Sequence, residues 1–250
     1  MPFFDHIAEL RRRLVYIVLF VFIGSLVLYL DIFYEPVFAF IMHPVTPVLA
    51  KLGVHKLIVL GPFEAFIVRF KVALIACVIL GSPFITYQIG SFFLPALKPK
   101  ERRGFVPFVL AIAFFFALGA AFCYSFVLGP GFYWLATQGG AMIQQQALAD
   151  RWLTGVLLFM LAFGIGFETP VVVFVLVYTG IVPYAKMRKN WRVAYLVISV
   201  VAAFATPDWS WFSMTSLAVS MIILYEGAMA FSWVLLRKKI KAERLAELGA

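Results

Sequence analysis

Residues 105–128 of the chain read FVPFVLAIAFFFALGAAFCYSFVL, an apolar stretch without a charged side chain. A helix that crosses the ~30 Å hydrocarbon core of a bilayer needs about 20 such residues. The stretch is continuously apolar and does not alternate every second residue, which favours a membrane helix over a barrel strand. The sequence therefore predicts an integral membrane protein.

The composition of the whole chain supports this prediction. Of the 250 residues, 64% are hydrophobic and 13% are charged, whereas a soluble domain has about 45–50% apolar and about 25% charged residues. A soluble enzyme, a disordered protein and a secreted disulfide scaffold are therefore excluded. The two cysteines, Cys77 and Cys123, lie inside apolar runs without paired spacing, so we expect both to be small core residues.

Six apolar runs predict an all-α fold with six transmembrane helices, kinked spans, and short fifth and sixth spans. Prolines within or at the ends of the runs predict the kinks, because a proline lacks the N–H group and its ring clashes with the preceding turn. The fifth run is too short to cross alone unless the bilayer thins around it. The predicted single membrane domain, 1–250, contains an interfacial helix at 2–13, spans at about 14–30, 65–93, 105–128, 152–178, 193–205 and 212–236, an outer loop at 31–64 with two short helices, and a cytoplasmic tail at 237–250.

The distribution of Lys and Arg predicts the orientation. Most of the 21 basic residues lie before the first run, between the second and third, between the fourth and fifth, and after the sixth. The positive-inside rule then places both termini in the cytoplasm. The net charge of +9 indicates contact with anionic lipid, and no nucleic acid is expected as a partner. The first apolar run is longer than that of a signal peptide and lacks a small-x-small cleavage site, so we expect a signal anchor. The absence of a transit peptide favours a prokaryotic cytoplasmic membrane.

Acidic residues inside the apolar runs are candidates for function. Glu168 lies near the middle of the fourth run, in the segment 163–170 (FGIGFETP), and Glu226 lies nearer the cytoplasmic end of the sixth. An ionised carboxylate in hydrocarbon costs at least about 2–3 kcal/mol. Glu168 is therefore interpreted either as a site for a partner helix or coupled proton, or as a protonated side chain bonded to a neighbouring helix. Arg69 and Lys71, in the second run, are expected to extend their charged ends outward.

Two further acids lie among bases on the predicted cytoplasmic side. Glu9 precedes three consecutive arginines, 11–13, and Glu101 lies within the basic segment 98–103. Local ion pairing, for example of Glu9 with Arg13 four residues later, is one interpretation. The other is a docking site for a basic ligand, because carboxylates bind guanidinium groups with two hydrogen bonds.

The sequence contains no HExxH, GxGxxG, GxxxxGK[ST] or GxSxG motif, and its three histidines are dispersed. No cofactor and no metal site are predicted. A proton- or ion-coupled small-molecule transporter that uses Glu168 and Glu226 stays open as an alternative, although we find no internal repeat. An intramembrane protease would need a GxGD motif or a Ser-His pair at span depth, and the sequence has neither.

Five features follow one another along nearly the whole chain. They are HIAELRRRL at 6–14, PFEAF at 62–66, the segments SPFITYQ at 82–88, FFLPAL at 92–97 and KERR at 100–103, then FGIGFETP at 163–170 and TPD at 206–208. In this order they resemble TatC, the large subunit of the twin-arginine protein translocase, whose N-terminal signature is HLxELRxRL. The resemblance implies a receptor that, with the single-span proteins TatA and TatB, exports folded proteins with twin-arginine signal peptides, driven by the proton-motive force.

The resemblance also implies roles for individual residues. Glu9, Glu101, Arg11 and Phe92 match positions tied to signal-peptide recognition, and Glu168, followed by Thr169, matches the intramembrane site for TatA or TatB helices. Pro44 matches a proline of the outer loop. Glu226, Asp208 and Met214 are weaker candidates, since this chain has one proline before Asp208 where the family often has two, and Met214 where it often has glutamine. The implied protein is not an enzyme, and its partners are the signal peptides, TatA and TatB, lipid and further copies of itself.

Overall fold

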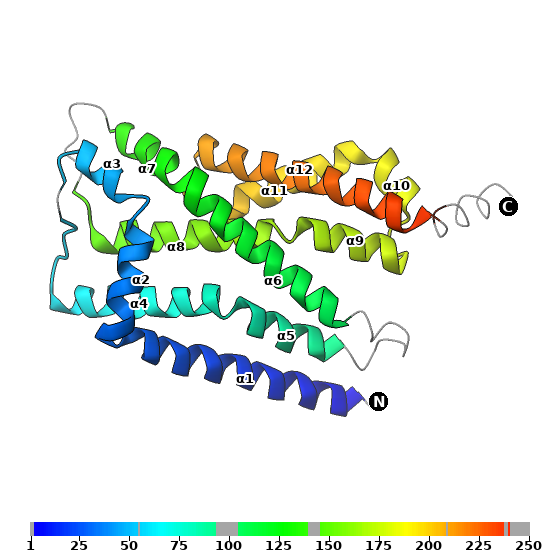
Figure 1. The fold of residues 1–250 in the computed structure, drawn as a ribbon, viewed down its shortest axis with the longest axis horizontal. Helices are drawn as coiled ribbons and strands as arrows, with labels where there is room; N and C mark the ends of the chain where they lie inside the picture. The colour runs from blue at the N-terminus through cyan, green and yellow to red at the C-terminus, as the bar shows by residue number, and fades with distance from the viewer. Residues whose placement is uncertain are drawn as a thin grey trace, which may run out of the picture. The chain divides into compact units, whose positions relative to one another are not determined.

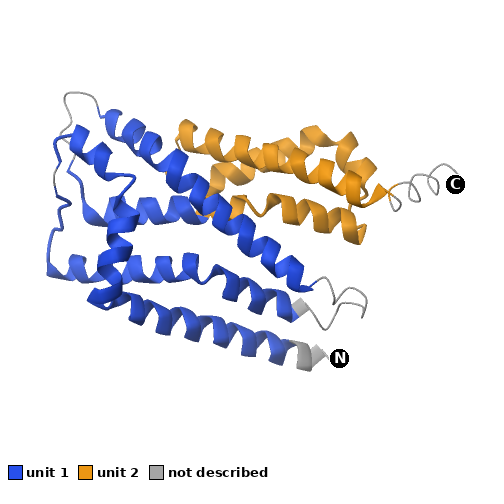
Figure 2. Cartoon of the chain, in the orientation of Figure 1, with its two compact units in different colours: residues 1–161 blue, residues 162–250 orange. Residues whose placement is uncertain are grey.

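The computed structural model of the protein describes residues 3–54, 56–93, 105–139, 146–208, 210–237 and 240. Within these ranges the chain is helical, apart from turns and one isolated bridge between Ile58 and Leu148 (Figure 1). The helices form two compact units, Met1–Leu161 and Ala162–Ala250 (Figure 2), which are described in turn. The predicted all-α class is confirmed over these ranges. The number of spans and the side on which the termini lie stay predictions.

The first unit begins with α1, a single helix of 27 residues, Phe3–Tyr29. The sequence predicts an interfacial helix at 2–13 followed by a separate span, and the structure shows no break between them. Residues 3–14 contain neither glycine nor proline, so nothing in the local sequence ends the first segment. A methyl group on Gly24 of α1 would come within 2.5 Å of the Sγ atom of Cys77, so glycine allows α1 to pack closely on α4.

The predicted second span, 65–93, consists of two helices, α4 (Pro62–Leu80) and α5 (Ser82–Phe93). They meet at Gly81, whose N–H donates to the carbonyl of Cys77 at 2.8 Å. Pro83 follows in the first turn of α5, where its missing N–H costs no helical hydrogen bond. Both helices pack against α1 (Figure 1), and the predicted kink is confirmed as a break at Gly81.

The outer loop contains α2 (Asp31–Met42) and α3 (Thr46–Lys51). The sequence predicts two short helices there, at 37–42 and 45–52, and α2 begins earlier than predicted, at Asp31. A π-helical turn, Cys123–Val127, joins α6 (Phe105–Phe122) to α7 (Leu128–Thr137). The helix runs past the predicted end of this span at 128 and past Pro130, to Thr137, and the point at which the span ends stays a prediction. A wider π turn accommodates a proline that cannot donate to the preceding turn. Cys77 and Cys123 are free and buried, as predicted.

The predicted fourth span, 152–178, comprises α8 (Ala149–Gly166), along which the first unit ends and the second begins, and α9 (Thr169–Thr179) of the second unit. The turn between them holds Phe167 and Glu168. Pro170 lies in the first turn of α9, where its missing N–H costs no helical hydrogen bond. Gly180 ends α9 with a φ of 78°, a left-handed conformation that glycine adopts without steric cost.

The rest of the second unit contains α10 (Tyr184–Lys189), α11 (Trp191–Ala205) and α12 (Trp211–Leu235). Both α9 and α11 pack against α12. At 15 residues, α11 rises only about 22 Å and is short, as predicted. The helix α12, which corresponds to the predicted sixth span, has 25 residues, so the expectation of a short sixth span is wrong. The serines of α12 do not end the helix, because their hydroxyls can donate to backbone carbonyls of the same helix. The hydroxyl of Ser220, for example, donates to the carbonyl of Ser216 at 2.8 Å.

By length and composition, four helical stretches among the described residues are sufficient to cross a membrane: Ile7–Tyr29, Phe105–Thr137, Ala149–Thr179 and Trp211–Leu235. The apolar helix Trp191–Ala205 is shorter. The protein is therefore a multi-pass membrane protein.

Candidate functional site

A hydrogen-bonded network joins α1 to α5 around Glu9. The Nε and Nη2 atoms of Arg13 both donate to Oε1 of Glu9, at 3.1 and 2.8 Å. The third nitrogen of the same guanidinium, Nη1, donates to Oε1 of Gln88 on α5 at 3.3 Å. The predicted pairing of Glu9 with Arg13 is confirmed. The link to Gln88, which is 9% exposed, fixes this pair to a second helix.

Phe92 lies one helical turn after Gln88, and residues four apart share a face of a helix. The structure therefore brings the helix that carries Phe92 against the segment of α1 that carries Glu9. Arg11 is exposed, and no ion pair involves it in the described ranges. Glu101, the second predicted acid of this site, lies in 94–104, outside the described residues. Whether the two acids meet is therefore still a prediction.

Glu168 lies in the turn between α8 and α9. Its backbone N–H donates to the carbonyl of Ile165 at 3.0 Å, while its side chain does not cap α9. Both carboxylate oxygens are buried, and neither has a hydrogen-bond partner among the residues that the structure describes. Buried polar groups are nearly always hydrogen-bonded, so such an exception calls for an explanation. Thr169 is different, since its hydroxyl donates to the carbonyl of Gly166 at 2.6 Å.

Glu226 of α12 is engaged within the second unit. Its carboxylate accepts from Nη1 of Arg188 at 2.7 Å and from the hydroxyl of Tyr195 at 2.8 Å. The bond to Glu226 raises the pKa of Arg188 above its ordinary value. The arrangement ties α10 and α11 to α12. Unlike Glu168, Glu226 has its charge and its hydrogen bonds satisfied.

Asp208 organises the start of α12. One oxygen of its carboxylate accepts from the hydroxyls of Ser210 and Ser213, the latter at 2.8 Å. Ser210 is the N-cap of α12 and accepts from the N–H of Ser213 at 3.2 Å. Met214 lies in the first turn of α12, and its N–H donates to the carbonyl of Ser210 at 3.0 Å. In this structure Asp208 and Met214 are parts of a helix start.

Pro44 lies in the turn between α2 and α3. A methyl group on Gly129 of α7 would come within 3.6 Å of the carbonyl oxygen of Pro44, so this turn packs close to α7. Nearby, the ring of Tyr124 stacks on that of Phe40 at 4.5 Å, and its hydroxyl donates to the carbonyl of Phe40 at 2.9 Å. These contacts give the outer loop of the first unit a defined position.

The sequence analysis did not predict the contacts that Arg69 makes at the end of α1. Arg69 of α4 donates from Nε and Nη2 to the carbonyl of Tyr29, at 3.1 and 2.6 Å, and pairs with Asp31. Its guanidinium also lies over the rings of Tyr29 and Tyr34, at 4.6 and 4.5 Å. Burial raises the pKa of the Tyr34 phenol, and the charge of Arg69 opposes that rise.

Lys71 of α4 likewise pairs with Asp150, at the start of α8, and the hydroxyl of Thr154 donates to the same carboxylate. Arg69 and Lys71 thus each have an acidic partner, Asp31 and Asp150, that the sequence analysis did not predict. The signal was present in the sequence, since a cation within an apolar run almost always has a partner. The sequence did not identify which acid that partner would be.

The described part of the chain contains no group of three or more His, Cys, Asp or Glu side chains that could hold a metal ion. Two candidate sites follow from the geometry. One is the network of Glu9, Arg13 and Gln88 on α1 and α5, and the other is the buried Glu168 in the turn between α8 and α9. Neither arrangement contains a paired nucleophile and base.

Comparisons with known proteins agree with one another. The family model described as Sec-independent protein translocase protein (TatC) matches residues 5–219 of the chain. The Sec-independent protein translocase protein TatC of Carboxydothermus hydrogenoformans is 31% identical over 250 residues, covering 98% of each chain. The protein of the same name from Deinococcus radiodurans is 34% identical over 234 residues, covering 93% of this chain and 86% of the relative.

A solved structure is similar over the same length. The crystal structure described as the twin arginine translocase receptor TatC superposes with a TM-score of 0.73 at 29% identity. The match covers 92% of this chain and 98% of that chain.

Proposed function

The chain belongs to the TatC family of Sec-independent protein translocase proteins, and from this premise we propose that it is the receptor for twin-arginine signal peptides in its own translocase. The observation that carries the proposal is the position of Glu9. Its carboxylate accepts two hydrogen bonds from Arg13 of α1, and Arg13 in turn donates to Gln88 of α5. The helix α5 also carries Phe92, a second residue that the family resemblance assigns to recognition.

Docking begins with the two arginines of the signal peptide. Glu9 and Glu101 accept hydrogen bonds from their guanidinium groups, because a carboxylate matches the planar guanidinium fork. Phe92 provides an apolar surface beside them, and the exposed Arg11 contributes to recognition at the same end of α1. The apolar part of the signal peptide then enters between the kinked spans. No covalent bond is made or broken, so the protein acts as a receptor and not as an enzyme.

The partner helices bind near Glu168 and Thr169. The oxygens of Glu168 are buried and have no hydrogen-bond partner within the described ranges, which supports this proposal, since a polar group in hydrocarbon is stabilised by a hydrogen bond from a neighbouring helix. TatA- and TatB-type single-span proteins supply such helices. The assembled complex, with further copies of this chain, exports folded proteins with the proton-motive force.

The protein crosses the cytoplasmic membrane of a prokaryote, with both termini and the signal-peptide site in the cytoplasm. Its clusters of Lys and Arg support this orientation. We propose no transporter function, because Glu226 is already bonded to Arg188 and Tyr195. A structural ion pair is a sufficient account of that acid.

Export of a twin-arginine substrate in cells tests the docking site. Glu9→Gln and Glu101→Ala should each abolish or strongly reduce export, while the proteins still insert in the membrane. Glu35→Gln, a change of the same type on the exposed face of α2, should export normally. Normal export by both site variants at wild-type protein levels would show that the docking residues are wrongly assigned.

A further inference from the structure

We propose that Arg13 and Gln88 are positioning residues that hold the carboxylate of Glu9 with one oxygen presented to an incoming guanidinium, and that they thereby set the preference for arginine over lysine. The inference rests on the proposed function, since it concerns the same docking site. Neither residue is among those that the family resemblance assigns to recognition.

The geometry of the network is unusual for a local ion pair. An i, i+4 pair on an exposed helix surface is worth only about 0.3–0.5 kcal/mol and leaves both side chains mobile. Here the side chains of Arg13 and Glu9 are only 18% and 17% exposed. All three nitrogens of the Arg13 guanidinium donate, two to Glu9 and one to Gln88. Because Gln88 belongs to α5, the orientation of the pair is fixed by two helices.

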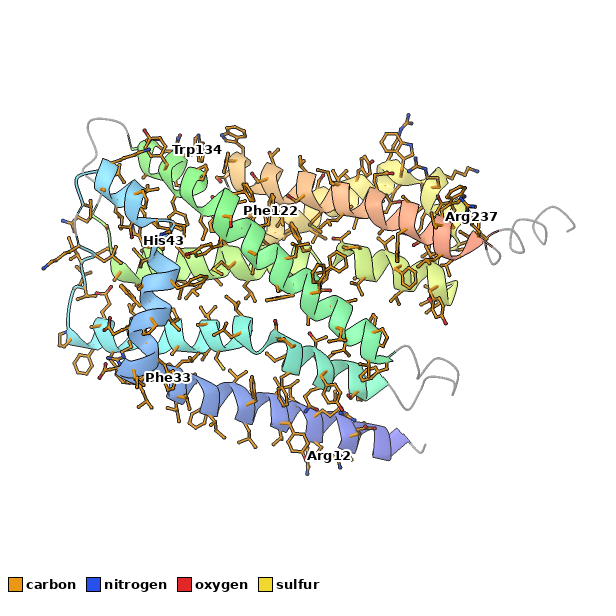
Figure 3. The ribbon with its side chains drawn as sticks, viewed as in Figure 1. Arg12, Phe33, His43, Phe122, Trp134 and Arg237 are labelled. Carbon is orange, nitrogen blue, oxygen red and sulfur yellow. The ribbon has the colours of Figure 1, made fainter. Side chains whose placement is uncertain are left out.

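Arg13 bonds to only one of the two carboxylate oxygens of Glu9. Both of its bonds to Glu9 end on Oε1, and no hydrogen bond to Oε2 occurs within the described ranges. A carboxylate offers about four acceptor positions, so Oε2 keeps its acceptor positions for a ligand. Arg12, the residue before Arg13 in the chain, takes no part in this network. It is exposed, projects from the side of α1 opposite to α5 (Figure 3), and lies 6.0 Å from the centroid of the Tyr16 ring.

A fixed carboxylate discriminates between arginine and lysine. Guanidinium is planar, and its donors form a rigid fork that requires an acceptor at the correct angle. The lysine ammonium is a compact charge with rotatable donors, so the orientation of the acceptor affects it less. Holding Glu9 therefore favours an arginine ligand much more than a lysine ligand.

The positive charge of Arg13 has a second consequence. It already neutralises much of the charge of Glu9, so Glu9 alone does not balance a ligand that carries two guanidinium groups. The site then requires another acid, and Glu101 is the candidate on the predicted cytoplasmic side.

Binding of signal peptides to the purified full-length protein in detergent tests the inference. Two fluorescent peptides are compared, one with the Arg-Arg pair and one with Lys-Lys in its place. The variants are Arg13→Lys, which keeps the charge and removes the fork, and Gln88→Leu, which removes the link to α5. Arg12→Lys is the matched control. Thermal unfolding, followed by a thiol dye that reacts with Cys77 and Cys123 as they become exposed, reports whether each variant is folded.

The Arg-Arg peptide should bind each site variant about tenfold more weakly, the loss expected when one hydrogen bond to a charged group goes. The Lys-Lys peptide and the Arg12→Lys control should change little. The double variant should lose no more than either single variant, because the two residues act as one unit.

Three outcomes would overturn the inference: unchanged affinity for the Arg-Arg peptide, an equal loss for both peptides, or tighter binding, which would make Arg13 a competitor of the ligand. Equal binding of the two peptides to the unaltered protein would instead contradict the proposed function. The two failures are therefore distinguishable.

Discussion

Replacing Glu168 by leucine should stabilise the protein and stop export. Both carboxylate oxygens of Glu168 are buried without a partner among the described residues, and the side chain does not cap α9. An unsatisfied buried polar group costs about 1–3 kcal/mol. Leucine fills a similar volume without that cost, so Glu168→Leu should raise the free energy of unfolding by about 1–3 kcal/mol. At about 2–4 °C per kcal/mol for a chain of this size, the change is measurable as a rise in the unfolding temperature.

The assay is thermal unfolding in detergent, followed by the loss of helical circular dichroism. Glu168→Gln is the control, because its amide keeps the unsatisfied polar atoms and should bring little stability. The same variants are then tested for export. Lower stability of Glu168→Leu would show that the carboxylate has a stabilising partner, and normal export by a stable Leu variant would refute its role in binding partner helices.

Two further predictions concern residues that join helices. Arg69→Met should destabilise the first unit by roughly 2–4 kcal/mol, because the Tyr29 carbonyl loses its partner and two ring contacts are lost; Asp31→Asn should cost little, since the Asp31 side chain is 84% exposed. The reaction of a thiol dye with Cys77, on the same helix as Arg69, reports the unfolding of both variants. An equal loss of stability in the two variants would contradict the assignment of the larger contribution to Arg69. Asp208→Ala should weaken the start of α12 by about 1 kcal/mol, because the hydroxyls of Ser210 and Ser213 lose their shared acceptor, as measured by circular dichroism; an unchanged unfolding temperature would show that Ser210 caps the helix without help from Asp208.

The sequence predicts most of the helices because a bilayer restricts the structures with which a chain can cross it. Continuous apolar runs identify the helices around 105–128 and 212–236, and prolines identify the breaks near Gly81 and Glu168. Helix ends are less predictable. The π turn at Cys123–Val127 carries the helix past Pro130, and only packing decides whether a proline ends a helix or bends it.

The candidate site was predictable where its contacts are local. Glu9 and Arg13 are four residues apart, so helical spacing alone predicts their pair. Gln88 lies 75 residues from Arg13, and no local pattern connects them. The same holds for Arg69 with Asp31 and for Lys71 with Asp150. The sequence shows that these cations need partners, but only the packing of the helices determines which acids provide them.

Photo-crosslinking from position 92 tests the receptor function most directly. A photoreactive residue replaces Phe92, on the helix whose Gln88 is bonded to Arg13, and inverted membranes receive either an Arg-Arg signal peptide or its Lys-Lys counterpart. We expect a crosslink with the Arg-Arg peptide that is lost with the Lys-Lys peptide and with excess unlabelled Arg-Arg peptide. Equal crosslinking of both peptides, or none in protein shown to be inserted, would contradict the assignment of the signal-peptide site to this face of α1 and α5.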